Sequence, residues 1–282
     1  MMNSSEENKV KEKAVLDFSN LPETGFSEDT TQQVRMYFSE IIKNVDEFVR
    51  EFHAIPDTLL YNESYMEQFV LNNIGLNNES LGELAPELAP YFGTGLYIWQ
   101  NPKQFSKYMI WLLKNAQNCS SYLEIGSRWG GTFIVTCEVL RRVNPNFKYA
   151  IAADLIEATP FIERYASIAT EAGLEIIYFE GSSTSDEFIQ MVTEYKPNIT
   201  LIDGDHRISG ALKDHMLVRK FSKIIVHHDV CSDTCPESTL LWNSLKQLES
   251  EMNHTEFIDQ YPSLKGNYFG IGVLFRDSKR GV

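Results

Sequence analysis

Acidic and imidazole side chains follow two largely apolar segments of the sequence, at the point where each segment ends. Residues 199–202 (ITLI) and 223–226 (KIIV) are these segments, and they are followed by Asp203, Asp205, His206, His227, His228 and Asp229. If the segments are neighbouring strands of a parallel sheet, their carboxyl ends lie at one edge, where open α/β sheets bind ligands. Buried carboxylates this close would repel one another unless a cation neutralised them. Oxygen-rich groups with some imidazole suit hard or borderline ions, so the pattern predicts a site for Mg²⁺ or Mn²⁺.

The sequence leaves alternatives open for three members of this group. Successive strand residues face opposite sides, so His227 is expected to point away from the site if Asp229 faces into it. Asp205 could contribute to the site or cap the helix that follows it. His206 is a candidate general base, and its alternative is an ordinary surface histidine at a helix start.

A glycine-rich turn follows an earlier apolar segment, in residues 122–133 (YLEIGSRWGGTF). Glycines permit backbone to approach a ligand closely, although the same turn could serve packing alone. A dinucleotide fingerprint would need its second glycine where Arg128 stands, which disfavours nicotinamide cofactors. A phosphate-binding P-loop would need a lysine where Thr132 stands, which disfavours ATP.

A second apolar segment ending in an acid, residues 149–154 (YAIAAD), comes one helix length after the turn. This order predicts a βαβ unit. A carboxylate at the end of the second strand can accept hydrogen bonds from both ribose hydroxyls, so Asp154 is the candidate ribose ligand. A third segment, residues 174–179, runs into Gly181-Ser182-Ser183, which taken alone indicates only a turn.

The pattern E-x-G-x-x-x-G-G at residues 124–131 resembles the first motif of class I S-adenosylmethionine-dependent methyltransferases. The resemblance covers roughly residues 97–276, including IWQNP at 98–102 and the pair Leu241-Trp242. It implies an α/β fold with a Rossmann-like seven-stranded sheet whose last strand is antiparallel. The strands would lie at residues 122–125, 149–154, 174–179, 199–202, 223–226, 256–261 and 268–275. The cofactor-binding residues that it implies are Glu124, Gly126, Ser127, Gly130, Gly131, Asp154, Gly181, Ser182, Ser183 and Asp203.

The strand ends IDGDH and HD narrow this resemblance to a metal-dependent branch of small-molecule O-methyltransferases. That branch includes enzymes of the cephalosporin-biosynthesis, rhamnosyl and macrolide-sugar types. Catechol-type enzymes share its layout, with one metal aspartate after the fourth strand, a lysine base three residues later and an Asp-Asn pair after the fifth strand. Asp203 matches the first aspartate, His206 stands at the lysine position, and His228-Asp229 falls on the pair.

The resemblance therefore implies a cofactor, a metal and a reaction. S-Adenosylmethionine would donate the methyl group to a small-molecule or sugar hydroxyl. Asp203, His228 and Asp229 would hold the ion, and Asp203, His206 and His228 would be catalytic, with His206 as the base. Two alternatives are a metal-dependent hydrolase or hydroxylase with the same Asp/His group, and a non-catalytic cofactor-binding subunit.

Composition and charge favour a soluble enzyme of small molecules. The 282-residue chain has 25 Lys and Arg against 39 Asp and Glu, a net charge of −14. This charge opposes phosphate-backbone binding, so nucleic acid is not expected as a partner. The sequence contains no apolar run of about 18 residues and starts with polar and charged residues, so we expect no membrane partner and a cytoplasmic location.

The four cysteines do not form a disulfide framework in a chain of this length and are expected to be reduced thiols. Cys231 and Cys235 lie beside the His-Asp group and suggest zinc. The sequence has no C-x-x-C motif that could complete such a site, which argues against a zinc site built on this pair.

The N-terminal third is predicted to lie outside the cofactor-binding domain. Three regions are expected: a flexible N-terminus at 1–28, a helical extension at 29–96 and the methyltransferase domain at 97–282. Apolar residues at helical spacing mark residues 30–52 as an amphipathic helix, with further helices at 64–74 and 81–88. These helices could cap the substrate side, form a homo-oligomer contact, or simply pack on the core.

Overall fold

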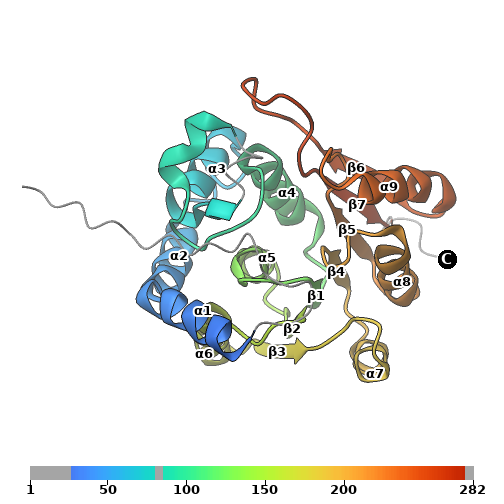
Figure 1. The fold of residues 1–282 in the computed structure, drawn as a ribbon, viewed down its shortest axis with the longest axis horizontal. Helices are drawn as coiled ribbons and strands as arrows, with labels where there is room; N and C mark the ends of the chain where they lie inside the picture. The colour runs from blue at the N-terminus through green and yellow to red at the C-terminus, as the bar shows by residue number, and fades with distance from the viewer. Residues whose placement is uncertain (1–26, 80–84, 277–282) are drawn as a thin grey trace, which may run out of the picture.

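The computed structural model describes residues 27–79 and 85–276, which contain a seven-stranded sheet in the order β3-β2-β1-β4-β5-β7-β6 (Figure 1). Its strands are β1 (Ser121–Ile125), β2 (Tyr149–Asp154), β3 (Glu175–Glu180), β4 (Ile199–Ile202), β5 (Ile224–His228), β6 (Asn253–Phe257) and β7 (Ile271–Phe275). Strands β1 to β5 pair in parallel, whereas β7 is antiparallel to both β5 and β6. The predicted Rossmann-like α/β fold with an antiparallel last strand is therefore confirmed.

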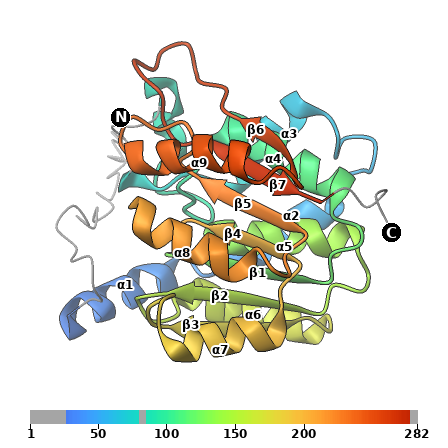
Figure 2. The same ribbon diagram turned by 90° about the vertical axis from the view of Figure 1, so that its right-hand side faces the viewer.

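Helices cover both faces of this sheet (Figures 1 and 2). One face carries α4 (Pro102–Asn115), α5 (Gly131–Val143) and α6 (Pro160–Glu171), and the other carries α7 (Asp186–Tyr195), α8 (Ile208–Val218) and α9 (Pro236–Leu248). Every residue of the central strands β1, β4 and β5 is buried. Burial on both faces explains why these strands are largely continuous apolar segments instead of alternating ones.

The chain reverses its direction of travel across the sheet between β1 and β4, since β2 and β3 lie on one side of β1 and β4 on the other. In open α/β sheets such a switch point opens a crevice outside the carboxyl ends of the strands. The glycine-rich turn after β1 and the acidic residues after β4 and β5 all lie at this edge.

The N-terminal helices form an additional layer outside α4, α5 and α6 (Figure 1). They are α1 (Glu28–Glu40), α2 (Lys43–Ala54), α3 (Glu63–Phe69), a π-helix η1 (Val70–Ile74) and a 3-10 helix η3 (Pro86–Tyr91). Helix α1 contacts α6, α2 contacts α5 and α6, and α3 contacts α4. Their buried apolar side chains belong to the same hydrophobic cluster as residues of the sheet, and they include Val34, Phe38, Val45, Phe48, Phe52, Met66 and Phe69.

Polar contacts also tie this layer to the core. Glu138 of α5 is fully buried, and its carboxylate contacts His53 of α2, accepts a hydrogen bond from the Tyr165 hydroxyl at 2.6 Å, and pairs with Arg141. Arg142 donates to the carbonyl oxygens that end α2, including that of Ile55 at 2.8 Å. A buried carboxylate needs these partners, because a buried charge without them would be costly. Glu138 therefore fixes the relative positions of α2, α5 and α6.

The structure differs from the predicted elements in two places. The amphipathic segment 30–52 forms two helices, because the chain turns at Ile41 and Ile42 between α1 and α2. Strand β6 ends at Phe257, several residues earlier than predicted, and the chain then forms the loop 258–270. Gln104 of α4 holds this loop by donating to the carbonyl of Asp259 and accepting from the amide of Gly270.

The predicted flexible N-terminus lies almost wholly outside the described residues, as does the first half of the predicted helix 81–88. In the described ranges, no helix is long and apolar enough to cross a membrane.

Candidate active site at the carboxyl edge of the sheet

Asp203, His228 and Asp229 converge where β4 and β5 end. The Nδ1 atom of His228 lies 3.1 Å from the Asp203 Oδ1 and 3.6 Å from the Asp229 Oδ1. All three side chains are largely buried, with 20% of Asp203 exposed and less of the other two. The predicted metal ligands are thus brought together by two neighbouring parallel strands.

This donor set fits a divalent ion. His228 is close enough to both carboxylates for ion pairing, yet neither of its ring nitrogens makes a well-aligned hydrogen bond. Two ligands at right angles around an ion, each about 2.1 Å from it, are separated by about 3 Å. The separations around His228 are of this size, so the group has the spacing of a coordination shell.

The protonation states show how strongly these side chains interact. Burial opposes a charge on His228, but the neighbouring carboxylates of Asp203 and Asp229 outweigh it and raise the pKa of His228 to about 10. Burial likewise disfavours the ionised form of Asp229, but His228 and His206 hold the pKa of this carboxyl well below its usual range. The positive charge that these pKa shifts favour on His228 balances the negative charge of the Asp203 and Asp229 carboxylates. A metal cation bound between the carboxylates would balance the same charge.

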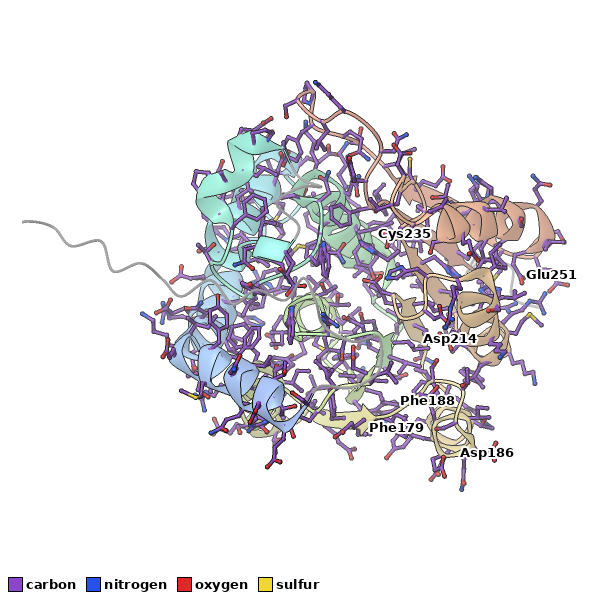
Figure 3. All side chains as sticks on the ribbon, in the orientation of Figure 1. Phe179, Asp186, Phe188, Asp214, Cys235 and Glu251 are labelled. Atoms are coloured by element: carbon purple, nitrogen blue, oxygen red, sulfur yellow. The ribbon has the colours of Figure 1, made fainter. Side chains whose placement is uncertain are left out.

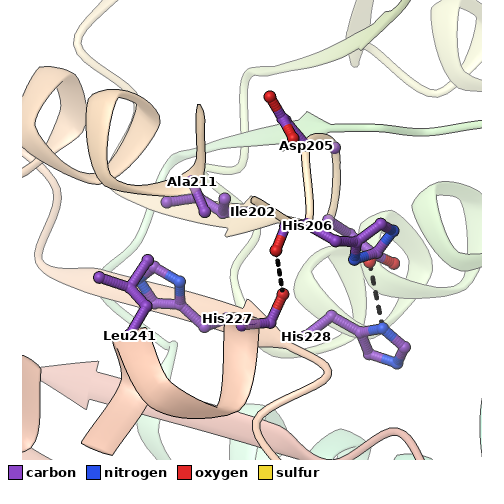
Figure 4. A pocket seen from close by; sticks show the side chains of 10 residues that line it. Ile202, Asp205, His206, Ala211, His227, His228 and Leu241 are labelled. Carbon is purple, nitrogen blue, oxygen red and sulfur yellow. Dashed lines mark hydrogen bonds and ion pairs between the residues drawn. The ribbon is translucent and has the colours of Figure 1, made fainter. Parts of the chain in front are cut away.

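His206 stands beside this group, half exposed at the start of the segment leading into α8. Its Nδ1 lies 3.1 Å from the Asp229 Oδ2. Its backbone carbonyl accepts a hydrogen bond from the Ser238 hydroxyl (Figure 4). Hydrogen bonds with Asp229 and Cys235 raise the pKa of His206 to about 11. Asp229 orients one ring nitrogen, which leaves the other for a proton acceptor role once the neighbouring charge is neutralised.

Asp205 and His227 do not join the ligand group. Figure 4 shows both side chains pointing away from His228. The His227 ring packs beside Trp242 and lies 3.1 Å from the Nδ1 of His215, on the side of α8 and α9, as strand alternation predicts. The Asp205 carboxylate accepts from the amide of Arg207 and pairs with its guanidinium. Arg207 is the N-cap residue of α8, where the described residues provide no side-chain capping hydrogen bond, so Asp205 does not take the helix-capping role either.

The glycine-rich turn is shaped by close backbone approaches. Gly126 has a φ of +87°, and a Cβ there would meet the carbonyl oxygen of Asp203 at 2.1 Å. A Cβ on Gly131 would meet the Leu96 carbonyl at 2.3 Å. Gly130 has a φ of +90° and precedes α5. Gly126 therefore allows the turn after β1 to lie against the backbone of Asp203 after β4, and Gly131 allows the start of α5 to lie against the backbone of Leu96.

Glu124 and Asp154 are the two acids on the cofactor side. Glu124 is buried, and its carboxylate accepts a hydrogen bond from the hydroxyl of Tyr122, two residues earlier on the same face. Burial raises the pKa of Glu124. The Asp154 Oδ2 accepts from the amide of Arg128 at 2.7 Å, and its Oδ1 accepts from the amide of Leu155 at 2.7 Å. Asp154 thus fixes the glycine-rich turn and still has lone pairs for a ligand.

The remaining predicted cofactor residues lie in short turns at the same edge. Ser127 is buried, and its amide donates to the Ala153 carbonyl at the end of β2. Gly181 donates its amide to the Asp154 carbonyl, and the hydroxyl of Ser182 contacts that of Thr184. Ser182 is exposed and Ser183 partly so, as a ligand-contacting turn requires.

Two residues near the site, Phe269 and Gln104, were not foreseen from the sequence. The Phe269 ring lies beside His228 with ring centroids 5.7 Å apart, and Gln104 holds the loop that carries it. Cys235, one residue before α9, approaches His206 and Asp229. The contacts of Phe269 and Gln104 join segments that are far apart in the sequence, and local patterns carry no signal for them. Cys235, in contrast, follows Asp229 closely in the sequence.

A small cavity lies behind the strand ends, lined by Asp203, His206, His228 and residues of α8 and α9 (Figure 4). Its volume of about 10 Å³ accommodates about one water molecule. A nucleoside cannot fit in this cavity.

The sequence matches no protein-family model and no curated protein. Among solved structures, the likeness is weak. Cofactor-bound Rv0187 from MTB is 13% identical, with 82% of this chain and 95% of that chain covered and a TM-score of 0.44. MycE methyltransferase from the mycinamycin biosynthetic pathway, solved with Mg and SAH, is 13% identical, with 64% and 52% covered and a TM-score of 0.41.

A third structure is a candidate tRNA methyltransferase from Streptococcus pneumoniae with bound S-adenosyl-L-methionine. It is 14% identical, with 62% of this chain and 75% of that chain covered and a TM-score of 0.39. Likeness at these identities and TM-scores carries no argument about the reaction of this chain, which has to be inferred from its own site.

Proposed function

We propose that this protein is an S-adenosylmethionine-dependent O-methyltransferase that uses a divalent ion to methylate a small-molecule or sugar hydroxyl. The observation that carries the proposal is the convergence of Asp203, His228 and Asp229 beside the glycine-rich turn. A methyl-donor cofactor and a metal ligand set would then meet at the switch point of a seven-stranded sheet.

The residues after β1 and β2 suit the cofactor. A sulfonium is a competent methyl donor, so the protein has mainly to bind it and align an acceptor oxygen with it. Asp154 offers lone pairs to ribose hydroxyls at the end of β2 while its other contacts hold the turn. Glu124, buried next to Tyr122, provides a polar group toward the amino-acid end of the cofactor.

The residues after β4 and β5 suit acceptor activation. Asp203, His228 and Asp229 would hold a Mg²⁺ or Mn²⁺ ion, whose charge would lower the pKa of a nearby hydroxyl. Neutralisation of Asp203 and Asp229 would also lower the pKa of His206 and leave its ring able to accept a proton. Phe269 adds an apolar wall beside His228 that would shield the acceptor from water.

The test measures cofactor binding and metal binding separately. Calorimetry should detect S-adenosylmethionine binding in the presence of EDTA, and electron paramagnetic resonance should detect Mn²⁺ binding without cofactor. Asp154→Asn should weaken cofactor binding by about 1–3 kcal/mol, the scale of a lost charged hydrogen-bond partner, and leave Mn²⁺ binding intact. Asp203→Asn should weaken Mn²⁺ binding. Asp186→Asn, at an exposed position on α7, is the matched control for both.

Turnover is measured with methyl-labelled cofactor and a panel of sugar and aliphatic hydroxyls. EDTA should suppress the transfer and added Mg²⁺ or Mn²⁺ should restore it. Metal binding without any cofactor binding would favour the hydrolase or hydroxylase alternative. Cofactor binding with neither metal binding nor turnover would favour the non-catalytic subunit, and full activity in excess EDTA would remove the metal from the mechanism.

A further inference from the structure

Asp229 presents its two carboxylate oxygens to two different groups of side chains. Its Oδ1 lies 3.6 Å from the Nδ1 of His228, within the ligand group formed with Asp203. Its Oδ2 lies 3.1 Å from the Nδ1 of His206, on the other side. A carboxylate placed in this way can bridge two neighbouring cations, one through each oxygen.

A thiol completes the second group. Ligand atoms of His206, Asp229 and Cys235 all lie within 4.8 Å of one another, as do those of Asp203, His228 and Asp229. Cys235 immediately precedes Pro236 at the start of α9, and Figure 3 labels it near the beginning of that helix. His206 and Cys235 are partly exposed, so an ion can reach them, whereas Asp229 is buried.

The two groups differ in the ions that they favour. The Asp203 group offers two carboxylates and one imidazole, which suit Mg²⁺ or Mn²⁺. The group with Cys235 offers one thiolate, one imidazole and one carboxylate. Sulfur and nitrogen ligands favour borderline or soft ions over Mg²⁺. Catalytic zinc sites typically have three protein ligands in a tetrahedral arrangement and leave the fourth position open.

We propose that His206, Asp229 and Cys235 form a second cation site, selective for Zn²⁺ or a similar transition ion, which shares Asp229 with the Mg²⁺ or Mn²⁺ site. The backbone supports this arrangement. Asp229 has a φ of +57°, uncommon for a residue other than glycine, and its carbonyl accepts a hydrogen bond from the Thr239 hydroxyl of α9. The same helix thus holds Asp229 in place and begins next to the thiol that would complete the site.

Zinc in this site would act on the proposed reaction, and this consequence rests on the proposed function. An ion bound through the Nδ1 of His206 leaves the ring proton on Nε2, so the ring can no longer accept the proton of the acceptor hydroxyl. Zn²⁺ should therefore inhibit methyl transfer in the presence of saturating Mg²⁺. The binding of zinc itself needs neither cofactor nor turnover.

The test uses Co²⁺ as a spectroscopic substitute for zinc in the full-length chain, reduced with a reductant that contains no thiol. With Mg²⁺ in excess, Co²⁺ should produce a thiolate-to-cobalt charge-transfer band in the near ultraviolet. Cys235→Ser and Cys235→Ala should lose this band and keep Mn²⁺ binding at the Asp203 group. Cys231→Ser is the matched control and should keep the band, because Cys231 lies outside the cluster.

Zinc affinity gives the second measurement. In metal sites, removal of a side chain that hydrogen-bonds to a ligand weakens metal affinity by about 10- to 100-fold. Removal of the Cys235 thiolate, a ligand itself, should therefore weaken zinc binding by about 100-fold or more. No thiolate band in the unmodified protein, or an unchanged band in both Cys235 variants, would overturn the second site. Either result would leave S-adenosylmethionine binding unaffected, so this failure is distinct from a failure of the proposed function.

Discussion

At the scale of single residues, Asp214 of α8 is an acid that the fold buries outside the group formed by Asp203, His228 and Asp229. Its side chain is 1% exposed, and Figure 3 labels it on the α8 side of the sheet. Burial is the largest influence and raises its pKa to about 6, although Ser183 and Lys213 act in the opposite direction. The ionised carboxylate is therefore less stable in the folded protein than in the unfolded chain.

This pKa predicts how stability depends on pH. The folded pKa of about 6 exceeds the unfolded value of about 3.9, so the folded state binds the proton more tightly. The contribution of Asp214 to stability is then lost as the pH rises from about 4 to 6, up to about 3 kcal/mol. Asp214→Asn, which stays neutral, should be more stable than the unmodified protein at pH 7.5 by about 1–3 kcal/mol.

Urea denaturation at pH 4 and at pH 7.5 measures the difference. The advantage of Asp214→Asn should shrink at the lower pH, whereas Asp186→Asn should show no such trend because Asp186 is exposed. An advantage that stays constant with pH, or a less stable Asp214→Asn protein at pH 7.5, would contradict the assigned pKa.

At the scale of secondary-structure elements, the close approach between the turn after β1 and the residue that follows β4 depends on one glycine. Gly126 follows β1 with a φ of +87°, and a Cβ there would lie 2.1 Å from the Asp203 carbonyl. Gly126→Ala should destabilise the protein by about 2–5 kcal/mol, from the left-handed backbone and from overpacking together. Because the clash pushes against Asp203, Mn²⁺ affinity should fall as well.

Gly173→Ala is the matched control for this substitution. Gly173 has a φ of +79°, but a Cβ there meets nothing within 4 Å. Gly173→Ala should lower the free energy of unfolding by only about 1–2 kcal/mol, the cost of a left-handed backbone for alanine. Its Mn²⁺ affinity should not change. Equal losses for the two glycines in urea denaturation would show that the approach of β1 to β4 is not the decisive constraint.

At the scale of the whole molecule, the N-terminal helices are built into the main core. Their buried residues share one hydrophobic cluster with sheet residues, and Glu138 links α2 to α5 and α6. In this arrangement they pack on the helical layer α4–α6, which was one of the alternatives left open by the sequence. A homo-oligomer through these helices stays a prediction.

Shared packing predicts cooperative unfolding of the helices and the sheet. Phe48 of α2 is fully buried, so Phe48→Ala should cost about 3–5 kcal/mol. Hydrogen exchange should then lose protection in β5 as well as in α2, while Met36→Ala, exposed on α1, should change neither. Loss of protection confined to α1–α3 would show that these helices unfold as a separate unit.

The sequence by itself determined the sheet and the position of the site. Apolar segments ending in acids, separated by helix lengths, specified the parallel strands and placed Asp154, Asp203 and Asp229 at one edge, because parallel strands end on the same side. Alternation along β5 also separated His227 from its neighbours. These inferences depend on local periodicity, which the printed sequence contains in full.

Tertiary structure decided which of those residues meet and what else joins them. It placed Cys235 beside His206, used Asp154 to hold the Arg128 amide, and brought Phe269 against His228. It also divided the segment 30–52 into two helices, of which α1 packs against α6 and α2 packs against α5 and α6. Such contacts depend on the distances between segments remote in sequence, and those distances are set only when the layers pack around a common core.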